Sequence, residues 1–248
     1  MVSSRGKASP KSVKLGPMNK LFLLAVAAAV FALAACDKKT QTARQTAAPA
    51  AAPAHTMPTI AANPALLSPE KANEKAPEVF QVKVVTTKGD MVIEAHRAWS
   101  PNGADRFYNL VKIGYFDDTA FFRIVNGFMA QIGIHGDPAV NEKWRVSTIM
   151  DDAPAGQSNK PGYVTFAKTG MPNSRSTQIF FNFGDNAGLD GQGFTPFGRV
   201  IDGTPVLGAL NLEYGEAPDQ GAIQARGNSY LRSNFPNLDY IKTARIIP

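Results

Sequence analysis

Cysteine and histidine are both scarce in this chain. Its 248 residues include one cysteine, Cys36, and three histidines, His55, His96 and His135. A single cysteine excludes any intramolecular disulfide. The histidines are too few and too far apart in the sequence to provide a metal site with the usual ligand spacing. We therefore expect neither a disulfide framework nor a bound metal.

Hydrophobic runs long enough to cross a membrane are also lacking. The longest apolar run, residues 21–35, is shorter than the roughly 20 residues that a transmembrane helix needs. It follows residues 1–20, which carry basic but no acidic side chains. This combination is typical of an export signal. We expect residues 1–35 to be a signal peptide, with translation starting at Met1 or Met18.

The end of this run indicates lipid attachment. Its last residues and the next one, Leu33-Ala34-Ala35-Cys36, resemble the lipobox of bacterial lipoproteins. In that motif the cysteine is lipidated and becomes the first residue of the mature chain. We expect a lipid anchor at Cys36. The alternative is a plain signal peptide that is cleaved after an alanine, with Cys36 incidental.

Most of the positive charge belongs to the same leader. The chain has 26 Lys and Arg against 20 Asp and Glu, a net charge of +6. Residues 1–35 hold five of the basic groups and no acid, so the remainder has a net charge of only +1. This near balance does not indicate a nucleic-acid partner. A single thiol suits an oxidising exported compartment, and we expect a protein facing the periplasm, anchored in the inner or the outer membrane.

Residues 36–76 show no hydrophobic period. They are rich in Ala, Pro, Thr and Gln, and repeated prolines such as Pro49, Pro53 and Pro58 prevent a long helix. This composition predicts a disordered tether. The folded domain is expected over residues 77–248, which is long enough for one sizeable core.

Alternation and capping signals predict a mixed domain. The runs 79–85 and 90–95 flank a turn and predict a hairpin. Ser100 is expected to cap a helix that ends at Gly114. Further strands are expected at 119–125, 128–134, 162–167, 178–183, 195–200 and 240–247, and further helices at 206–212 and 222–235. This pattern is compatible with an α+β domain or with a closed barrel that has helical ends.

One arginine stands among large apolar residues. Arg123 lies on a strand-like pattern with aromatic and β-branched neighbours, and Gln131 follows beyond a glycine turn. A buried arginine needs either a partner or a function. It is therefore either neutralised by a hidden carboxylate, such as Asp118 or Asp190, or directed into a pocket.

Three runs together carry a family resemblance. They are the arginine run 121–131, the run Ser-Thr-Gln-Ile-Phe-Phe-Asn at 176–182, and residues 189–200, which begin Leu-Asp-Gly. They resemble the cyclophilin family of peptidyl-prolyl cis/trans isomerases, over about residues 79–247. The resemblance implies a mainly β fold, a closed eight-stranded antiparallel barrel with a helix at each end. Residues 213–236 have no clear counterpart in short family members and are expected to be a C-terminal insertion.

The resemblance also implies a site. Arg123 matches the catalytic arginine, and Gln131 matches the glutamine that orients it and binds the substrate backbone. Large apolar residues such as Phe180 are, taken singly, more often part of the core, and glutamines such as Gln178 more often lie on a strand surface. Their occurrence together with Arg123 favours a pocket. Substrate-binding positions are implied at Phe128, Met129, Ala167, Lys168, Gln178, Phe180, Leu189 and Phe194.

Four departures from the family pattern are visible. Phe122 replaces the histidine that usually precedes the arginine, and Phe194 replaces a pocket histidine. Gly188 stands where a tryptophan often binds cyclosporin, so weak inhibition is expected. The residues after Gln131 are Ile132-Gly133-Ile134 in place of Gly-Gly-Asp. We expect catalysis to survive these changes.

The resulting expectation is a monomeric peptidyl-prolyl isomerase without a cofactor, acting on proline-containing exported polypeptides. The alternative is a non-catalytic module on the same barrel that binds proline segments or acts as a chaperone. A purely structural envelope lipoprotein is a third possibility, supported only by the tether.

Overall fold

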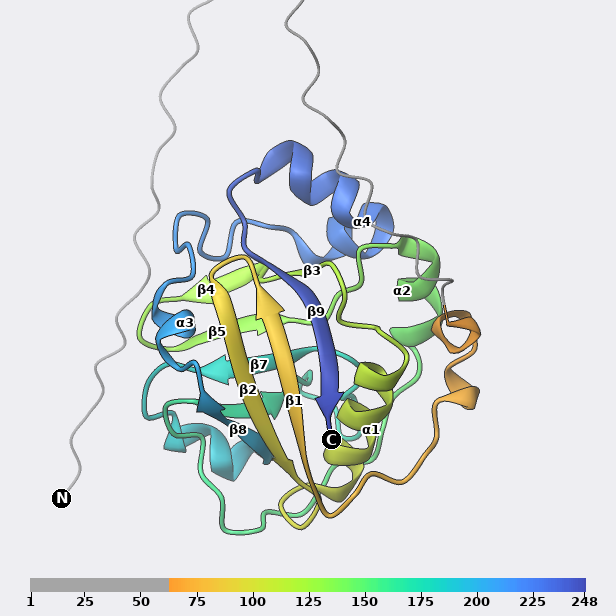
Figure 1. Cartoon of the computed structure of the whole chain (residues 1–248), viewed down its shortest axis with the longest axis vertical. Coiled ribbons are helices and arrows are strands. Elements are labelled where there is room, and N and C mark those ends of the chain that lie inside the picture. The colour runs from red at the N-terminus through yellow and green to blue at the C-terminus, as the bar shows by residue number, and fades with distance from the viewer. Residues whose placement is uncertain (1–62) are drawn as a thin grey trace, which may run out of the picture. The chain divides into compact units, whose positions relative to one another are not determined.

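A curled antiparallel sheet forms the centre of the computed structural model, which describes residues 63–248 (Figure 1). The expected signal peptide, Cys36 and the tether up to residue 62 lie outside the described residues. The strand order is β3-β9-β1-β2-β8-β6-β7-β5-β4. The strands are β1 (Val79–Thr86), β2 (Gly89–His96), β3 (Thr119–Ala120), β4 (Arg123–Val125), β5 (Met129–Ile132), β6 (Tyr163–Phe166), β7 (Ile179–Asn182), β8 (Pro196–Asp202) and β9 (Tyr240–Ile247).

The mainly β expectation is confirmed, but the sheet of the described region has nine strands and its margins do not pair. The strand expected at 119–125 is divided into β3 and β4. Phe121 and Ile124 pack in the main core, whereas Phe122, between them, packs in a second cluster and Arg123 lines a pocket. Two successive residues outside the core break the two-residue period of a strand. The margins of the sheet are therefore joined by the chain and not by a hydrogen-bonded ladder.

Four helices accompany the sheet in the described residues, where two were expected to cap the barrel. The helix α1 packs against β2, β8 and β9, and α3 packs against β2. The helix expected at 206–212 is shorter than predicted, and α2 was not predicted. The helices are α1 (Pro101–Lys112), α2 (Pro138–Trp144), α3 (Pro205–Gly208) and α4 (Gln220–Asn234).

A distant carboxylate caps α1. Ser100 makes no side-chain capping bond, and its hydroxyl donates instead to Asp152 Oδ2 at 2.5 Å. Asp152 also accepts the backbone N–H groups of Asn102 and Gly103, both at 3.0 Å. A negative charge at a helix N-terminus is favourable because it faces the unpaired N–H groups. Ser100 is the N-cap residue, as expected, but its side chain does not make the capping bond, which Asp152 supplies instead.

Residues 63–76 pack against the domain, although they were expected to belong to the disordered tether. They contain the short 3-10 helices η1 (Pro64–Leu67) and η2 (Pro69–Lys71). The Trp144 indole donates to the Leu66 carbonyl at 2.9 Å, and the Glu74 backbone exchanges two hydrogen bonds with the Asn109 side chain. Prolines exclude a long helix but suit such short turns. The folded part therefore begins no later than residue 63.

A second hydrophobic cluster holds α4 against one end of the sheet. Ile223 and Leu231 of α4 pack there with Phe122 and other buried side chains. At Gly227, with φ of 58° and ψ of −146°, α4 is kinked. A Cβ atom at Gly227 would lie 1.9 Å from the carbonyl oxygen of Gly136. Only glycine fits this conformation and this close approach.

Replacing Gly227 should therefore loosen α4. We expect Gly227→Ala to lower the free energy of unfolding by about 2–4 kcal/mol, through the strained backbone and the clash with Gly136. Gly208→Ala is the matched control, because its added methyl group meets no atom within 4 Å. Urea unfolding of both variants tests this, and an equal effect of the two substitutions would contradict it.

Candidate active site

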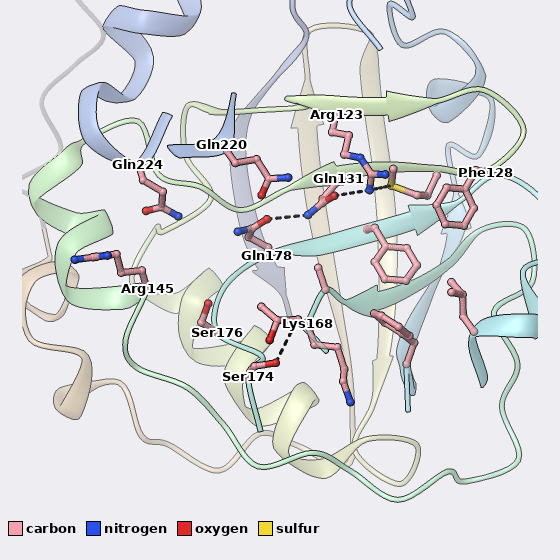
Figure 2. A pocket seen from close by; sticks show the side chains of 16 residues that line it. Arg123, Phe128, Gln131, Arg145, Lys168, Ser174, Ser176, Gln178, Gln220 and Gln224 are labelled. Carbon is pink, nitrogen blue, oxygen red and sulfur yellow. Dashed lines mark hydrogen bonds between the residues drawn. The ribbon is translucent and has the colours of Figure 1, made fainter. Parts of the chain in front are cut away.

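A pocket of about 420 Å³ opens beside the hairpin of β4 and β5 (Figure 2). It is lined by every residue that the sequence analysis assigned to catalysis or substrate binding. These are Arg123, Phe128, Met129, Gln131, Ala167, Lys168, Gln178, Phe180, Leu189 and Phe194. They come from four regions of the chain, and the fold of the sheet brings them together.

Strand register explains the central row of the pocket. Arg123 on β4 is opposite Gln131 on β5, and Gln131 is opposite Phe180 on β7. Met129 lies two residues before Gln131, so both point to the same face of β5. Between them, Ala130 points into the main core. The alternation of a single short strand thus separates pocket residues from core residues.

One half of the pocket is apolar. Met129 and Phe180 are almost fully buried, at 2% and 5% exposure. The rings of Phe180 and Phe194 meet edge to face, with 6.0 Å between their centroids. Phe128 lines the same pocket. It follows Gly127, which adopts a φ of 70° in the turn between β4 and β5. These side chains form a slot that can exclude water from a small apolar group.

A chain of polar side chains runs along the opposite edge (Figure 2). Arg123 Nη1 donates to Gln131 Oε1 at 3.1 Å, and Gln131 Nε2 donates to Gln178 Oε1 at 2.8 Å. Because a guanidinium only donates, it fixes the orientation of both amides. The Gln178 amide nitrogen makes no hydrogen bond to any residue that the structure describes, so it remains available as a donor.

Arg123 has a carboxylate partner that the sequence did not indicate. Its Nε donates to Glu216 Oε1 at 2.6 Å. Of the two acids proposed as hidden partners, Asp118 pairs instead with Arg232 at 2.7 Å. The other, Asp190, accepts a hydrogen bond from Asn159 at 2.7 Å. Glu216 belongs to residues 213–236, for which the sequence provided no register relative to β4.

Lys168 lines the pocket, but its ammonium group is already paired. Its Nζ lies 3.1 Å from Asp151 Oδ2 and 6.0 Å from the centre of the Phe194 ring. Burial by itself raises the pKa of Asp151, but hydrogen bonds from the Asn173 backbone and from Lys168 outweigh this effect and lower the pKa. The lysine therefore secures the wall of the pocket through its bond to Asp151.

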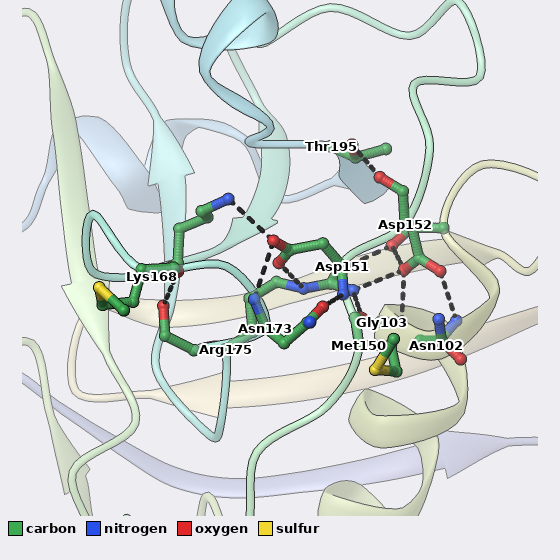
Figure 3. Close-up of polar contacts among 12 residues, drawn as sticks. Asn102, Gly103, Met150, Asp151, Asp152, Lys168, Asn173, Arg175 and Thr195 are labelled. Atoms are coloured by element: carbon green, nitrogen blue, oxygen red, sulfur yellow. Dashed lines mark hydrogen bonds and ion pairs between the residues drawn. The ribbon is translucent and has the colours of Figure 1, made fainter.

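A buried ionic cluster supports this wall from behind (Figure 3). Arg175 is 1% exposed, and its Nη2 lies 3.0 Å from Asp152 Oδ2. Its Nε lies 3.4 Å from Asp151 Oδ1, and its Nη2 also donates to the carbonyl of Met150. The cluster ties the loop at residues 150–152 to the loop that carries the pocket residues Ser174 and Ser176.

Several further residues line the pocket that sequence reasoning did not assign. Gln220 and Gln224 are spaced by four residues and therefore share one face of α4, a pattern that was visible in the sequence. Arg145 follows α2, a helix that was not predicted. The complete set of unassigned residues is Arg145, Thr169, Ser174, Ser176, Gln220 and Gln224.

The described residues 63–248 contain no group of three or more His, Cys, Asp or Glu side chains placed to hold a metal ion. Within the same range, no helix combines the length and the apolar character that crossing a membrane requires.

Comparison with known proteins identifies the family. The family model described as cyclophilin type peptidyl-prolyl cis-trans isomerase/CLD matches residues 81–225. The chain belongs to the cyclophilin family. It is 32% identical over 163 residues to peptidyl-prolyl cis-trans isomerase B of Escherichia coli K12, covering 63% of this chain and 92% of that protein. It is 33% identical over 136 residues to isomerase cyp18 of Streptomyces antibioticus, covering 52% and 81%.

Solved structures agree at the level of the fold. A cyclophilin type peptidyl-prolyl cis-trans isomerase from Cryptosporidium parvum superposes with a TM-score of 0.52 at 22% identity. The match covers 68% of this chain and 98% of that one. The curled sheet with its accompanying helices is therefore the cyclophilin fold.

The structure gives a reason for two of the departures from the cyclophilin pattern. Phe122 and Ile134 are 1% and 2% exposed and pack in the second cluster, under α4. Both positions are apolar because residues 213–236 cover them. Gly188 differs from them, because a Cβ atom there would meet nothing within 4 Å. Its lack of a side chain leaves that position open.

The ionic cluster should matter greatly for stability. We expect Asp152→Ala to lower the free energy of unfolding by about 3–5 kcal/mol, since it leaves Arg175 buried without its main partner and removes the cap of α1. Lys83→Ala is the control, because it breaks a 2.9 Å pair with Asp90 in which both side chains are about half exposed. That change should cost at most about 1 kcal/mol. Urea unfolding measures both effects. Similar losses of unfolding free energy in the two variants would contradict a large contribution of the ionic cluster to stability.

Proposed function

We propose that this cyclophilin accelerates cis-trans rotation about X-Pro bonds, with Arg123 acting at the prolyl nitrogen and the apolar slot holding the proline ring. The observation that carries the proposal is an arginine held beside the apolar side of a pocket, with Nη1 3.1 Å from Gln131 and Met129 only 2% exposed. Family membership and the names of its relatives support the same activity.

The chemistry requires binding and not bond cleavage. The barrier to rotation is about 18–20 kcal/mol because resonance gives the amide C–N bond double-bond character. Rotation makes the prolyl nitrogen pyramidal and turns its lone pair into a hydrogen-bond acceptor. A site that binds this twisted amide more tightly than either planar form lowers the barrier. The reaction needs no nucleophile and no redox cofactor.

Each side chain has a separate task in this proposal. The slot made by Phe128, Met129 and Phe180 holds the ring while the acyl side rotates. Arg123 donates to the prolyl nitrogen, and the Gln178 amide nitrogen donates to the client backbone. An acceleration of about 10⁵ requires about 7 kcal/mol. One charge-assisted hydrogen bond supplies about 1.5–3 kcal/mol, so the dry slot and the oriented dipoles supply the rest.

Replacing the arginine tests the proposal directly. We expect Arg123→Ala to slow the enzyme by about 10²–10³-fold, the usual effect of losing one donor to a transition state. Binding of a proline peptide should be largely retained, because the apolar slot remains. NMR exchange spectroscopy on such a peptide measures both quantities.

The control is Arg199→Ala. Arg199 is an exposed residue of β8, and its Nη2 lies 3.4 Å from Glu94 Oε1 on β2. This substitution should leave exchange unchanged. If the wild type binds the peptide without accelerating exchange, the chain is a proline-binding module and the proposal is wrong.

We also propose that the enzyme acts as a monomer on exported polypeptides while tethered to a membrane through Cys36. The support is the sequence of residues 1–35 and the motif that ends in Cys36. Cys36→Ser should move the protein from the membrane fraction to the soluble fraction of the cell envelope, because a lipid anchor contributes apolar surface that the folded domain does not. An unchanged distribution would contradict the anchor.

A further inference from the structure

Residues 213–236 reach the active site through the free edge of β4. The strand β4 is at the margin of the sheet. On that side, the backbone N–H of Ile124 donates to the carbonyl of Gly215 at 2.9 Å. Arg123 directly precedes Ile124, and Glu216 directly follows Gly215. This backbone bond therefore brings Glu216 beside Arg123. The contact is backbone to backbone and does not depend on either charged side chain.

The turn that carries Glu216 is itself held in place. Ala217 N–H donates to the Tyr214 carbonyl at 2.8 Å. The Tyr214 ring meets the ring of Phe235 edge to face, with centroids 5.2 Å apart. Directly after the turn, Asp219 caps α4 by accepting from Ala222 N–H at 2.7 Å. Glu216 therefore projects from a fixed turn.

At Arg123, the guanidinium is held from two sides. Glu216 Oε1 lies 2.6 Å from Nε and 2.5 Å from Nη2. On the other side, Nη1 donates to Gln131 Oε1 at 3.1 Å. All three nitrogens of the planar group thus contact fixed acceptors, which sets both the position and the tilt of its plane.

We propose that Glu216 is a positioning residue for Arg123 in the isomerase reaction, an inference that rests on the proposed function. Glu216 holds the guanidinium in the position and orientation in which it can donate to the twisted amide. An arginine without this carboxylate would sample other rotamers and would reach the productive geometry less often.

The carboxylate also has an opposing effect, because its charge offsets the positive charge that stabilises the transition state. The side chains of Arg123 and Glu216 are 30% and 60% exposed. At this exposure the Coulomb interaction is largely screened by water and salt, whereas the hydrogen-bond geometry is retained. Orientation therefore outweighs neutralisation, and the pair supports catalysis.

Two substitutions separate orientation from charge. Glu216→Ala removes the acceptor and should lower kcat by about three- to five-fold, with KM changed by less than about two-fold. Glu216→Gln keeps an acceptor oxygen but removes the charge, and it should recover most of the lost rate. Exchange spectroscopy with the purified chain and a proline peptide gives both constants. The Arg123 Nε–H signal in the same NMR samples should shift in the alanine variant.

Glu213→Gln is the matched control, because Glu213 lies on the same segment and accepts a hydrogen bond from Asn237 at 3.0 Å, away from the pocket. It should leave kcat unchanged. If both Glu216 variants are faster than the wild type, Glu216 is an inhibitory clamp and the inference is wrong. If neither variant changes kcat, or both lose equally, the positioning role is also wrong. A wild type that fails to accelerate exchange would instead overturn the proposed function itself.

Discussion

The structure depends on four consecutive residues, 121–124, two of which pack in the main core while the other two lie outside it. Phe121 and Ile124 pack in the main core, whereas Phe122 and Arg123 lie outside it. This division interrupts the strand and leaves β3 and β4 as the two margins of one curled sheet. It also places Arg123, which lines the pocket, directly after Phe122, which packs in the second cluster with α4. The pocket and the packing surface of α4 therefore share one short stretch of backbone.

Residues 213–236 and the unusual apolar residues beneath them form one arrangement. Without α4, Phe122 and Ile134 would expose large apolar side chains to water. Without these two residues, α4 would lack part of the apolar surface on which it packs. Once docked, the segment brings Glu216 to Arg123 and places Gln220 and Gln224 in the wall of the pocket. The segment thus packs against the sheet and also contributes directly to the lining of the pocket.

The other wall is stabilised by buried charge. Arg175 pairs with Asp151 and Asp152 and so connects two loops behind Lys168. Asp152 also caps α1. Between these loops the backbone forms only one isolated bridge, in which Ile149 N–H donates to the Arg175 carbonyl at 2.9 Å. The side-chain bonds of the cluster add to it. The apolar part of the pocket consequently lies between the hairpin of β4 and β5 and the loops that the ionic cluster connects.

Local periodicity determined much of this protein. The hairpin of β1 and β2, the extent of β9 and the helix from residue 101 followed from patterns within a few residues, and family resemblance indicated the residues that gather in the pocket. Only the tertiary structure decided that Asp152 caps α1, that residues 63–76 pack on the domain, and that Glu216 holds Arg123. The partners in these contacts lie far apart in the sequence, and such contacts leave no local periodic signal. Their geometry exists only once the sheet has folded.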